Sequence, residues 1–123
     1  MTDVSQATQY VFFVHAGPGE LARALHALLY AQELHRAGIP AKVVFDGAGT
    51  VWLREFSNPA HKYHGVFRRA LEAGLLEAAC AYCARAFQVT EAVQAAGVPL
   101  VDTAEGHPSL ASYVREGWTP IAL

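Results

Sequence analysis

The chain has 123 residues, a length that suits one domain with a single hydrophobic core. Hydrophobic residues make up 53% of it and the net charge is -2 with no basic block, which argues against nucleic acid as a partner. No apolar stretch approaches the roughly 20 residues that span a bilayer, and residues 1–6 lack the basic and apolar regions of a signal peptide. We therefore expect a cytoplasmic protein with no membrane contact.

A strand and a helix are predicted first. Residues Tyr10 to Val14 are aromatic or β-branched, as in a strand buried on both faces of a sheet. The Gly17-Pro18-Gly19 turn follows, with Pro18 suited to the first position of a helix and Glu20 to its first turn. Leucines then trace one helical face up to the stop at Gly38: Leu21, Leu25, Leu28, Leu29 and Leu34.

A second strand is predicted at Ala41 to Phe45, before the turn Asp46-Gly47-Ala48-Gly49. Thr50 is predicted to cap a short helix that runs through Phe56. After Ser57-Asn58-Pro59, apolar residues on one face predict another helix, which Gly74 ends: Tyr63, Val66, Phe67, Ala70 and Leu71.

The segment Leu75 to Ala79 allows two structures. It holds no β-branched residue, and local propensity alone allows one long helix that continues through Cys80 and Cys83. We predict a strand, because Gly74 is a natural helix stop and an alternating order of strands and helices needs a strand here.

The last part of the chain continues this alternation. Two helices and two strands are predicted: helices over Thr90 to Gly97 and Pro108 to Gly117, strands over Val98 to Val101 and Trp118 to Leu123. Pro120 cannot donate to a ladder, so the last strand is expected at an edge of the sheet. Residues 1–123 are therefore predicted to form a single α/β domain, with a mainly parallel five-stranded sheet and helices on both faces.

Polar residues lie at the predicted carboxyl ends of the strands, where such sheets bind ligands: His15, Asp46, Cys80 and Asp102. The chain's only cysteines, Cys80 and Cys83, stand three residues apart. In a reducing compartment this spacing is more typical of catalysis or metal binding than of a structural disulfide. A thiol at a helix N-terminus meets unpaired backbone N–H groups and the helix dipole, which predicts a lowered pKa for Cys80.

Four segments resemble the DsrE/DsrF-like family of small sulfur-relay proteins (TusD/YchN-like α/β proteins): Val11 to Gly19, the helix ending at Gly38, Val43 to Gly49, and Ala79 to Phe87. The last is the most diagnostic, because the family places an active-site cysteine at the start of a helix with alanine four residues on. Cys80 and Ala84 match that pattern, and Cys83 matches the second cysteine of the YchN-like branch. Many members have glycine just after this helix, where this chain has Gln88.

The resemblance implies a flavodoxin-like fold, a homotrimer or homohexamer, and sulfur carried as a persulfide on Cys80. Sulfur donor and acceptor proteins or small thiols would then be the partners. The apolar excess of the chain also predicts surface hidden between subunits, with Trp52, Phe56 and Tyr63 as candidate anchors.

Several functions are open at Cys80 and Cys83. In sulfur transfer, the Cys80 thiolate attacks the terminal sulfur of a donor persulfide, holds that sulfur and passes it to an acceptor thiol, while Cys83 can resolve the intermediate. A thiol–disulfide oxidoreductase is the second enzymatic alternative. A zinc site would need two ligands besides the cysteines. His61 and His64 stand three residues apart and could be donors, but the sequence has no second close pair to complete a site with them, so no metal is expected. A non-enzymatic oligomeric module that binds a small ligand, with both thiols buried and inert, is the remaining class.

The remaining candidate residues surround the cysteines in the predicted fold. His15 is expected beside the strand that leads to Cys80, where its imidazole would stabilise the thiolate or move its proton, unless it only completes a loop. Substrate contacts are predicted at four positions: Gly17, Gly19, Asp46 and Arg85. The glycine turn is neither a P-loop nor GxGxxG, so no nucleotide or other cofactor is expected. His107, before Pro108, is interpreted only as a residue that opens a helix.

Overall fold

The computed structural model describes residues 8–123 and contains the five predicted strands. The elements in chain order are β1 Gln9–Val14, α1 Leu21–Arg36, β2 Ala41–Phe45, the 3-10 helix η1 Gly47–Val51, α2 Trp52–Glu55, α3 His64–Glu72, β3 Leu76–Cys80, α4 Ala81–Ala86, α5 Thr90–Ala95, β4 Leu100–Val101, α6 Leu110–Arg115 and β5 Trp118–Ala122. The expected lack of a signal peptide concerns residues 1–6, which lie outside the described residues. Within residues 8–123, no helix is long and apolar enough to cross a bilayer.

The five strands form one sheet in the order β4-β3-β2-β1-β5, and every neighbouring pair is parallel. Strands β1 to β4 lie side by side in chain order, and β5 pairs with the free edge of β1. This confirms the predicted α/β class and its flavodoxin-like three-layer arrangement. The edge position predicted for the strand that contains Pro120 is also confirmed.

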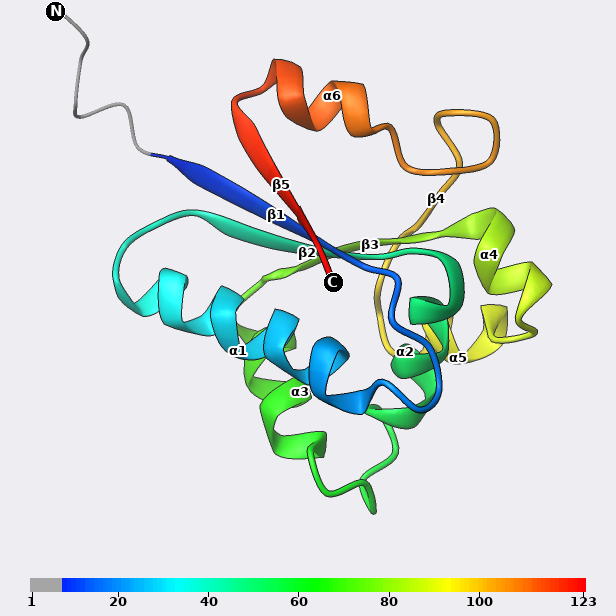
Figure 1. The fold of residues 1–123 in the computed structure, drawn as a ribbon. Coiled ribbons are helices and arrows are strands. Elements are labelled where there is room, and N and C mark those ends of the chain that lie inside the picture. Colours follow the sequence, from blue (N-terminus) through cyan, green and yellow to red (C-terminus); the bar gives the residue numbers. More distant parts are fainter. Residues whose placement is uncertain (1–7) are drawn as a thin grey trace, which may run out of the picture.

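The helices are divided unequally between the two faces of the sheet (Figure 1). The larger core joins inward side chains of the strands, such as Phe12, Val43 and Phe45, to residues of α1 through α5. On the opposite face, α6 places Tyr113 against Val11, Phe13 and Val44. The Tyr113 ring meets Phe13 edge-on at 5.8 Å between centroids, and its hydroxyl donates to Glu77 at 3.1 Å.

The segment before the cysteines is a strand, as predicted, and a long helix through Cys80 is excluded. Leu76, Ala78 and Ala79 are buried there, so packing within the sheet outweighs the helical propensity of these residues. The predicted cap at Thr50 is wrong. The Thr50 hydroxyl donates to the Gly47 carbonyl, and Asp46 caps η1 instead.

Two of the three aromatic residues expected at a subunit interface lie in the core of this chain. Phe56 is fully buried, and Trp52 is buried with its indole N–H donating to the Ala16 carbonyl at 2.7 Å. Their role as surface anchors is therefore wrong, and Tyr63 is half-buried. The large apolar side chains that are exposed stand elsewhere: Leu29, Tyr30, Tyr82, Phe87, Leu110 and Val114.

Gly49 is required by close packing of η1 against the end of β1. A Cβ at this position would lie 1.9 Å from the carbonyl oxygen of Val14, which also accepts the backbone N–H of Asp46. We predict that Gly49→Ala lowers the free energy of unfolding by about 3 kcal/mol, because neither backbone segment can give way.

Gly65→Ala is the matched control, since a Cβ there meets only a flexible Arg69 side-chain atom at 3.5 Å in α3. It is expected to raise stability by about 0.5–1 kcal/mol. Urea unfolding measures both, and equal unfolding midpoints for the two variants would contradict the packing of η1 described here.

Candidate functional site

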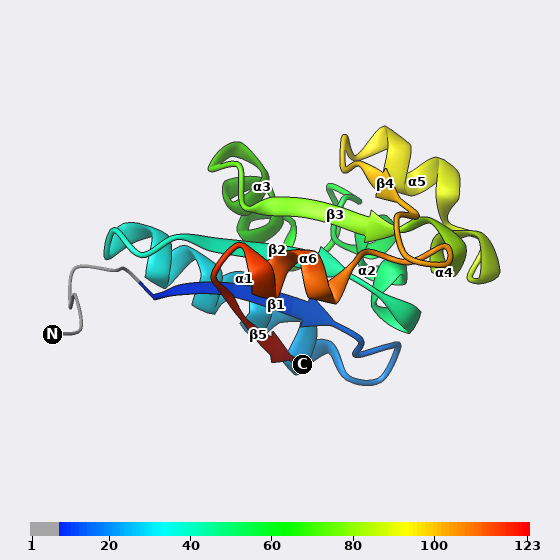
Figure 2. The same cartoon turned by 90° about the horizontal axis from the view of Figure 1, so that it is seen from above.

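Three neighbouring strands bring four side chains together at the carboxyl edge of the sheet. Asp46 follows β2, Cys80 ends β3, Cys83 lies in the first turn of α4, and His107 belongs to the segment after β4. One ligand-type atom from each residue lies within 4.8 Å of the others. We call Asp46, Cys80, Cys83 and His107 the thiol cluster. Figures 1 and 2 show the segment between β4 and α6 lying beside α4 at this end of the sheet.

Cys80 is the residue at which the strand becomes a helix. Its extended backbone ends β3, and its Sγ accepts the backbone N–H of Cys83 at 3.3 Å, so the cysteine itself caps α4. The Sγ lies 3.0 Å from Nδ1 of His107 and 3.6 Å from the carbonyl oxygen of Gly106. The buried thiol therefore has polar partners from three residues: Cys83, Gly106 and His107.

The predicted low pKa of Cys80 is wrong. The residue is 0% exposed, and burial raises the pKa of its thiol to about 12, with Cys83 and Asp46 adding to the increase. The backbone N–H of Cys83 lowers the pKa, as expected for a capping thiol, but by less than burial raises it. Cys83 is partly exposed, so the two thiols differ in access.

His107 lies within 4.0 Å of the other three members of the cluster, and the sequence did not identify it as a functional residue. Its Nδ1 lies 3.0 Å from Cys80 Sγ, 3.9 Å from Cys83 Sγ and 4.0 Å from Asp46 Oδ1. The Tyr82 ring stands 5.3 Å from the imidazole between centroids. One signal was available in the sequence: His107 follows the fourth predicted strand, which can pair with the strand that ends in Cys80.

Asp46 joins the cluster as the sequence suggested, through its place after β2. Its Oδ1 accepts the backbone N–H of Gly47 at 2.9 Å and the Cys83 thiol at 3.7 Å. Because one oxygen is held by the backbone of η1, the carboxylate is fixed in front of Cys83.

The expected neighbourhood of His15 and Cys80 is wrong, because β2 lies between β1 and β3. The exposed His15 instead lines a hollow of about 440 Å³ that also includes Asp46, on the face of the sheet covered by α6. The other lining residues are Phe13, Pro108, Leu110, Pro120 and Ala122. This hollow therefore adjoins the thiol cluster through Asp46 and through the residue next to His107.

The other predicted contacts lie outside the cluster. Arg85 is exposed and its guanidinium carbon stands 5.9 Å from the centre of the Tyr82 ring, and Asp102 is exposed on the segment after β4. Gly17 packs against η1, where a Cβ would come within 2.8 Å of the Ala48 Cβ. Gly19 has a φ of 94°, which favours glycine, and an added Cβ there would meet open space.

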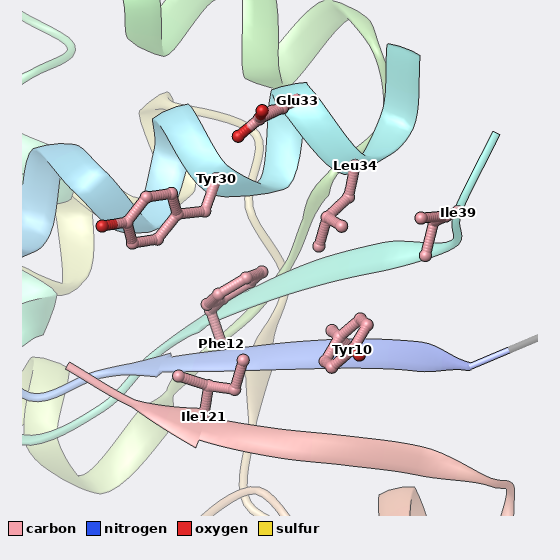
Figure 3. A pocket seen from close by; sticks show the side chains of 7 residues that line it. All are labelled: Tyr10, Phe12, Tyr30, Glu33, Leu34, Ile39 and Ile121. Carbon is pink, nitrogen blue, oxygen red and sulfur yellow. The ribbon is translucent and has the colours of Figure 1, made fainter. Parts of the chain in front are cut away.

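A second hollow, of about 350 Å³, lies between α1 and the strands β1 and β5 (Figure 3). Its walls are mostly apolar and include Tyr10, Phe12, Leu34 and Ile121, with Glu33 as the charged residue. It contains none of the four residues of the thiol cluster.

The fold and the cluster define a small parallel α/β protein with a thiol–imidazole site at the carboxyl edge of its sheet. No family model matches the sequence. The chain is 25% identical over 111 residues to the uncharacterized protein MJ0733 of Methanocaldococcus jannaschii, with 90% of this chain and 88% of that protein covered. A conserved protein of unknown function from Bacteroides thetaiotaomicron, BT1422, has a similar structure, with a TM-score of 0.68 and 15% identity over 92% of this chain and 94% of that one. These similarities support the fold.

Proposed function

We propose that this protein is a sulfur carrier of the DsrE/DsrF-like type, which holds sulfane sulfur as a persulfide on Cys80. The observation that carries the proposal is that one imidazole nitrogen lies close to both thiols, 3.0 Å from Cys80 Sγ and 3.9 Å from Cys83 Sγ. Such an arrangement allows a proton to leave one sulfur and return to the other. Two free thiols also suit a reducing cytoplasm.

A feature of the backbone supports the resemblance at the cysteine helix. Gln88, at the position after this helix where many members of that family have glycine, has a φ of 59°. This left-handed region is the one that favours glycine, so the chain keeps there a conformation that glycine adopts readily.

The difference in exposure supports an order in which the two cysteines act. Cys83 is partly exposed, whereas Cys80 is fully buried and burial raises its pKa to about 12, so little of it is thiolate at pH 7. We therefore place sulfur entry at Cys83. Its thiolate attacks the terminal sulfur of a donor persulfide, a new S–S bond forms, and the donor leaves as a thiolate.

The second step passes the sulfur inward. His107 Nδ1 takes the Cys80 proton while Cys80 Sγ attacks the terminal sulfur of the Cys83 persulfide. The Cys83–sulfur bond breaks, and Cys83 leaves as a thiolate that recovers the proton from His107. The sulfane sulfur keeps its oxidation state throughout, so no external oxidant is needed. The buried Cys80 persulfide is then shielded from bulk reductants until an acceptor thiol reaches it.

The hollow beside Asp46 offers space for the donor or the acceptor, as a small thiol or a protein segment. A homotrimer or homohexamer remains our expectation for the assembly. In place of the buried Trp52 and Phe56, the exposed Leu110 and Val114, one turn apart on α6, are the interface anchors that we propose.

Sulfur loading of the reduced, metal-free protein tests the proposal. With a cysteine desulfurase and cysteine as the source, intact-mass spectrometry is expected to find one added sulfur on the wild-type chain and none retained by Cys80→Ser after a brief wash with thiol. Cys83→Ser is expected to load slowly at Cys80. A Cys80–Cys83 disulfide without an adduct would instead establish a thiol–disulfide oxidoreductase, and two unmodified thiols would favour an inert ligand-binding module.

A further inference from the structure

We propose that Asp46, Cys80, Cys83 and His107 bind one thiophilic divalent cation, for which Zn²⁺ is the best match. The proposal goes beyond sulfur carriage and does not depend on it. The donor set is two sulfurs, one imidazole nitrogen and one carboxylate oxygen, and these ligand types together are typical of zinc. Ca²⁺ and Mg²⁺ are poor matches, because they require six or more oxygen ligands.

The distances among the donors are close to those of a tetrahedral site. Zinc bonds of about 2.0–2.3 Å in a tetrahedron separate the ligand atoms by about 3.3–3.8 Å. The His107 Nδ1 lies 3.0 and 3.9 Å from the two sulfurs and 4.0 Å from Asp46 Oδ1, and Cys83 Sγ lies 3.7 Å from that oxygen. The other two separations, from Cys80 Sγ to Cys83 Sγ and to Asp46 Oδ1, are at most 4.8 Å, so shifts of up to about 1 Å bring the four donors to tetrahedral spacing.

The backbone around the donors supports such a site. Cys80 is held in place by the end of β3. The Asp46 carboxylate accepts a hydrogen bond from the Gly47 N–H, and hydrogen bonds of this kind orient the ligands of metal sites. The segment that carries His107 is anchored by the Tyr82 N–H, which donates to the Gly106 carbonyl at 3.2 Å. Each donor thus comes from a segment whose position is set by the sheet or by a backbone hydrogen bond.

Four protein donors fill a tetrahedron and leave no open position, so the ion would not activate water. It would instead take both thiols as thiolates, with release of their protons, and tie the segment after β4 to α4. In that state neither sulfur can attack a donor persulfide. The bound ion would therefore hold the protein in a form that carries no sulfur.

Cobalt titration of the reduced protein, after chelator treatment and desalting, tests this site. One equivalent of Co²⁺ is expected to produce thiolate-to-metal charge-transfer absorption and the visible bands of tetrahedral Co²⁺, and Zn²⁺ is expected to displace it. Asp46→Asn and His107→Ala should each weaken binding at least about 100-fold, and Cys80→Ser and Cys83→Ser should also reduce the charge-transfer intensity. Asp102→Asn, a carboxylate at the next strand end but outside the cluster, should bind as the wild type does.

Circular dichroism of each metal-free variant shows that it is folded, and only folded variants are compared. Absence of thiolate charge transfer in the wild type, or unchanged affinity in both His107→Ala and Asp46→Asn, would overturn the site. Sulfur loading is measured separately in chelator. A chain that binds Co²⁺ but takes no sulfur supports the metal site and contradicts the proposed function, and the reverse result contradicts only the metal site.

Discussion

Replacement of His107 by alanine is expected to lower the rate at which Cys80 acquires sulfur by about 10²- to 10⁴-fold. The imidazole lies 3.0 Å from the Cys80 sulfur, which must lose its proton as the new S–S bond forms. Burial raises the pKa of that thiol to about 12, so little of it is thiolate at neutral pH, and a base that takes the proton while the S–S bond forms is needed for a fast reaction. Quenched time points analysed by peptide mass spectrometry give the rate in the metal-free protein.

His35→Ala is the matched control for this prediction, because it removes an exposed histidine from the last turn of α1. It is expected to leave the rate within about twofold of the wild type, as surface substitutions away from a site usually do. Added imidazole should restore part of the rate to His107→Ala, which a purely structural role of His107 would not allow. A variant that loads Cys80 at the wild-type rate would remove His107 from the mechanism.

The second large effect concerns the reactivity of the two thiols toward iodoacetamide. In the metal-free protein at pH 7.5, Cys83 is expected to be alkylated at least about 10³-fold faster than Cys80. Cys80 is fully buried with a pKa of about 12, whereas Cys83 is partly exposed.

The pH dependence follows from the same values. Only the thiolate reacts, so the alkylation rate of Cys80 should rise about tenfold per pH unit and continue to rise toward pH 12, as far as the fold survives. Peptide mass spectrometry at a series of pH values measures both cysteines. A Cys80 rate that levels off below pH 8 would show that the pKa of Cys80 is low, and burial would then not be the dominant influence on this residue.

Much of the fold could be predicted from local sequence. A strand buried on both faces, such as Tyr10 to Val14, needs aromatic or β-branched residues throughout, and that pattern is readable. Strand β3 was predictable only from its borders, since its leucine and alanines favour a helix and the sheet overrides them. Trp52 and Phe56 could not be placed, because an apolar aromatic side chain serves a core and an interface equally well.

The site could be predicted in part. Cys80 and Asp46 follow from the rule that ligands bind at the carboxyl ends of parallel strands. The place of His107 after the fourth predicted strand was a signal, but it does not show that the side chain reaches Cys80, because the path of the long segment after β4 is set by tertiary contacts such as the one between Tyr82 and Gly106. The same contacts cover Cys80, so its burial and raised pKa are also properties of the folded chain and not of the CxxC spacing.

The most direct test of the account is a quenched time course of sulfur on each cysteine of the wild-type, metal-free protein after mixing with one equivalent of a small persulfide donor. Peptide mass spectrometry distinguishes the Cys80 adduct from the Cys83 adduct. Either a protease cleaves the chain between the two cysteines, or the peptide that contains both is fragmented in the spectrometer. We predict that the Cys83 adduct forms first and decays as the Cys80 adduct rises. An adduct that appears on Cys80 without a Cys83 precursor, or no adduct on either thiol, would contradict the account.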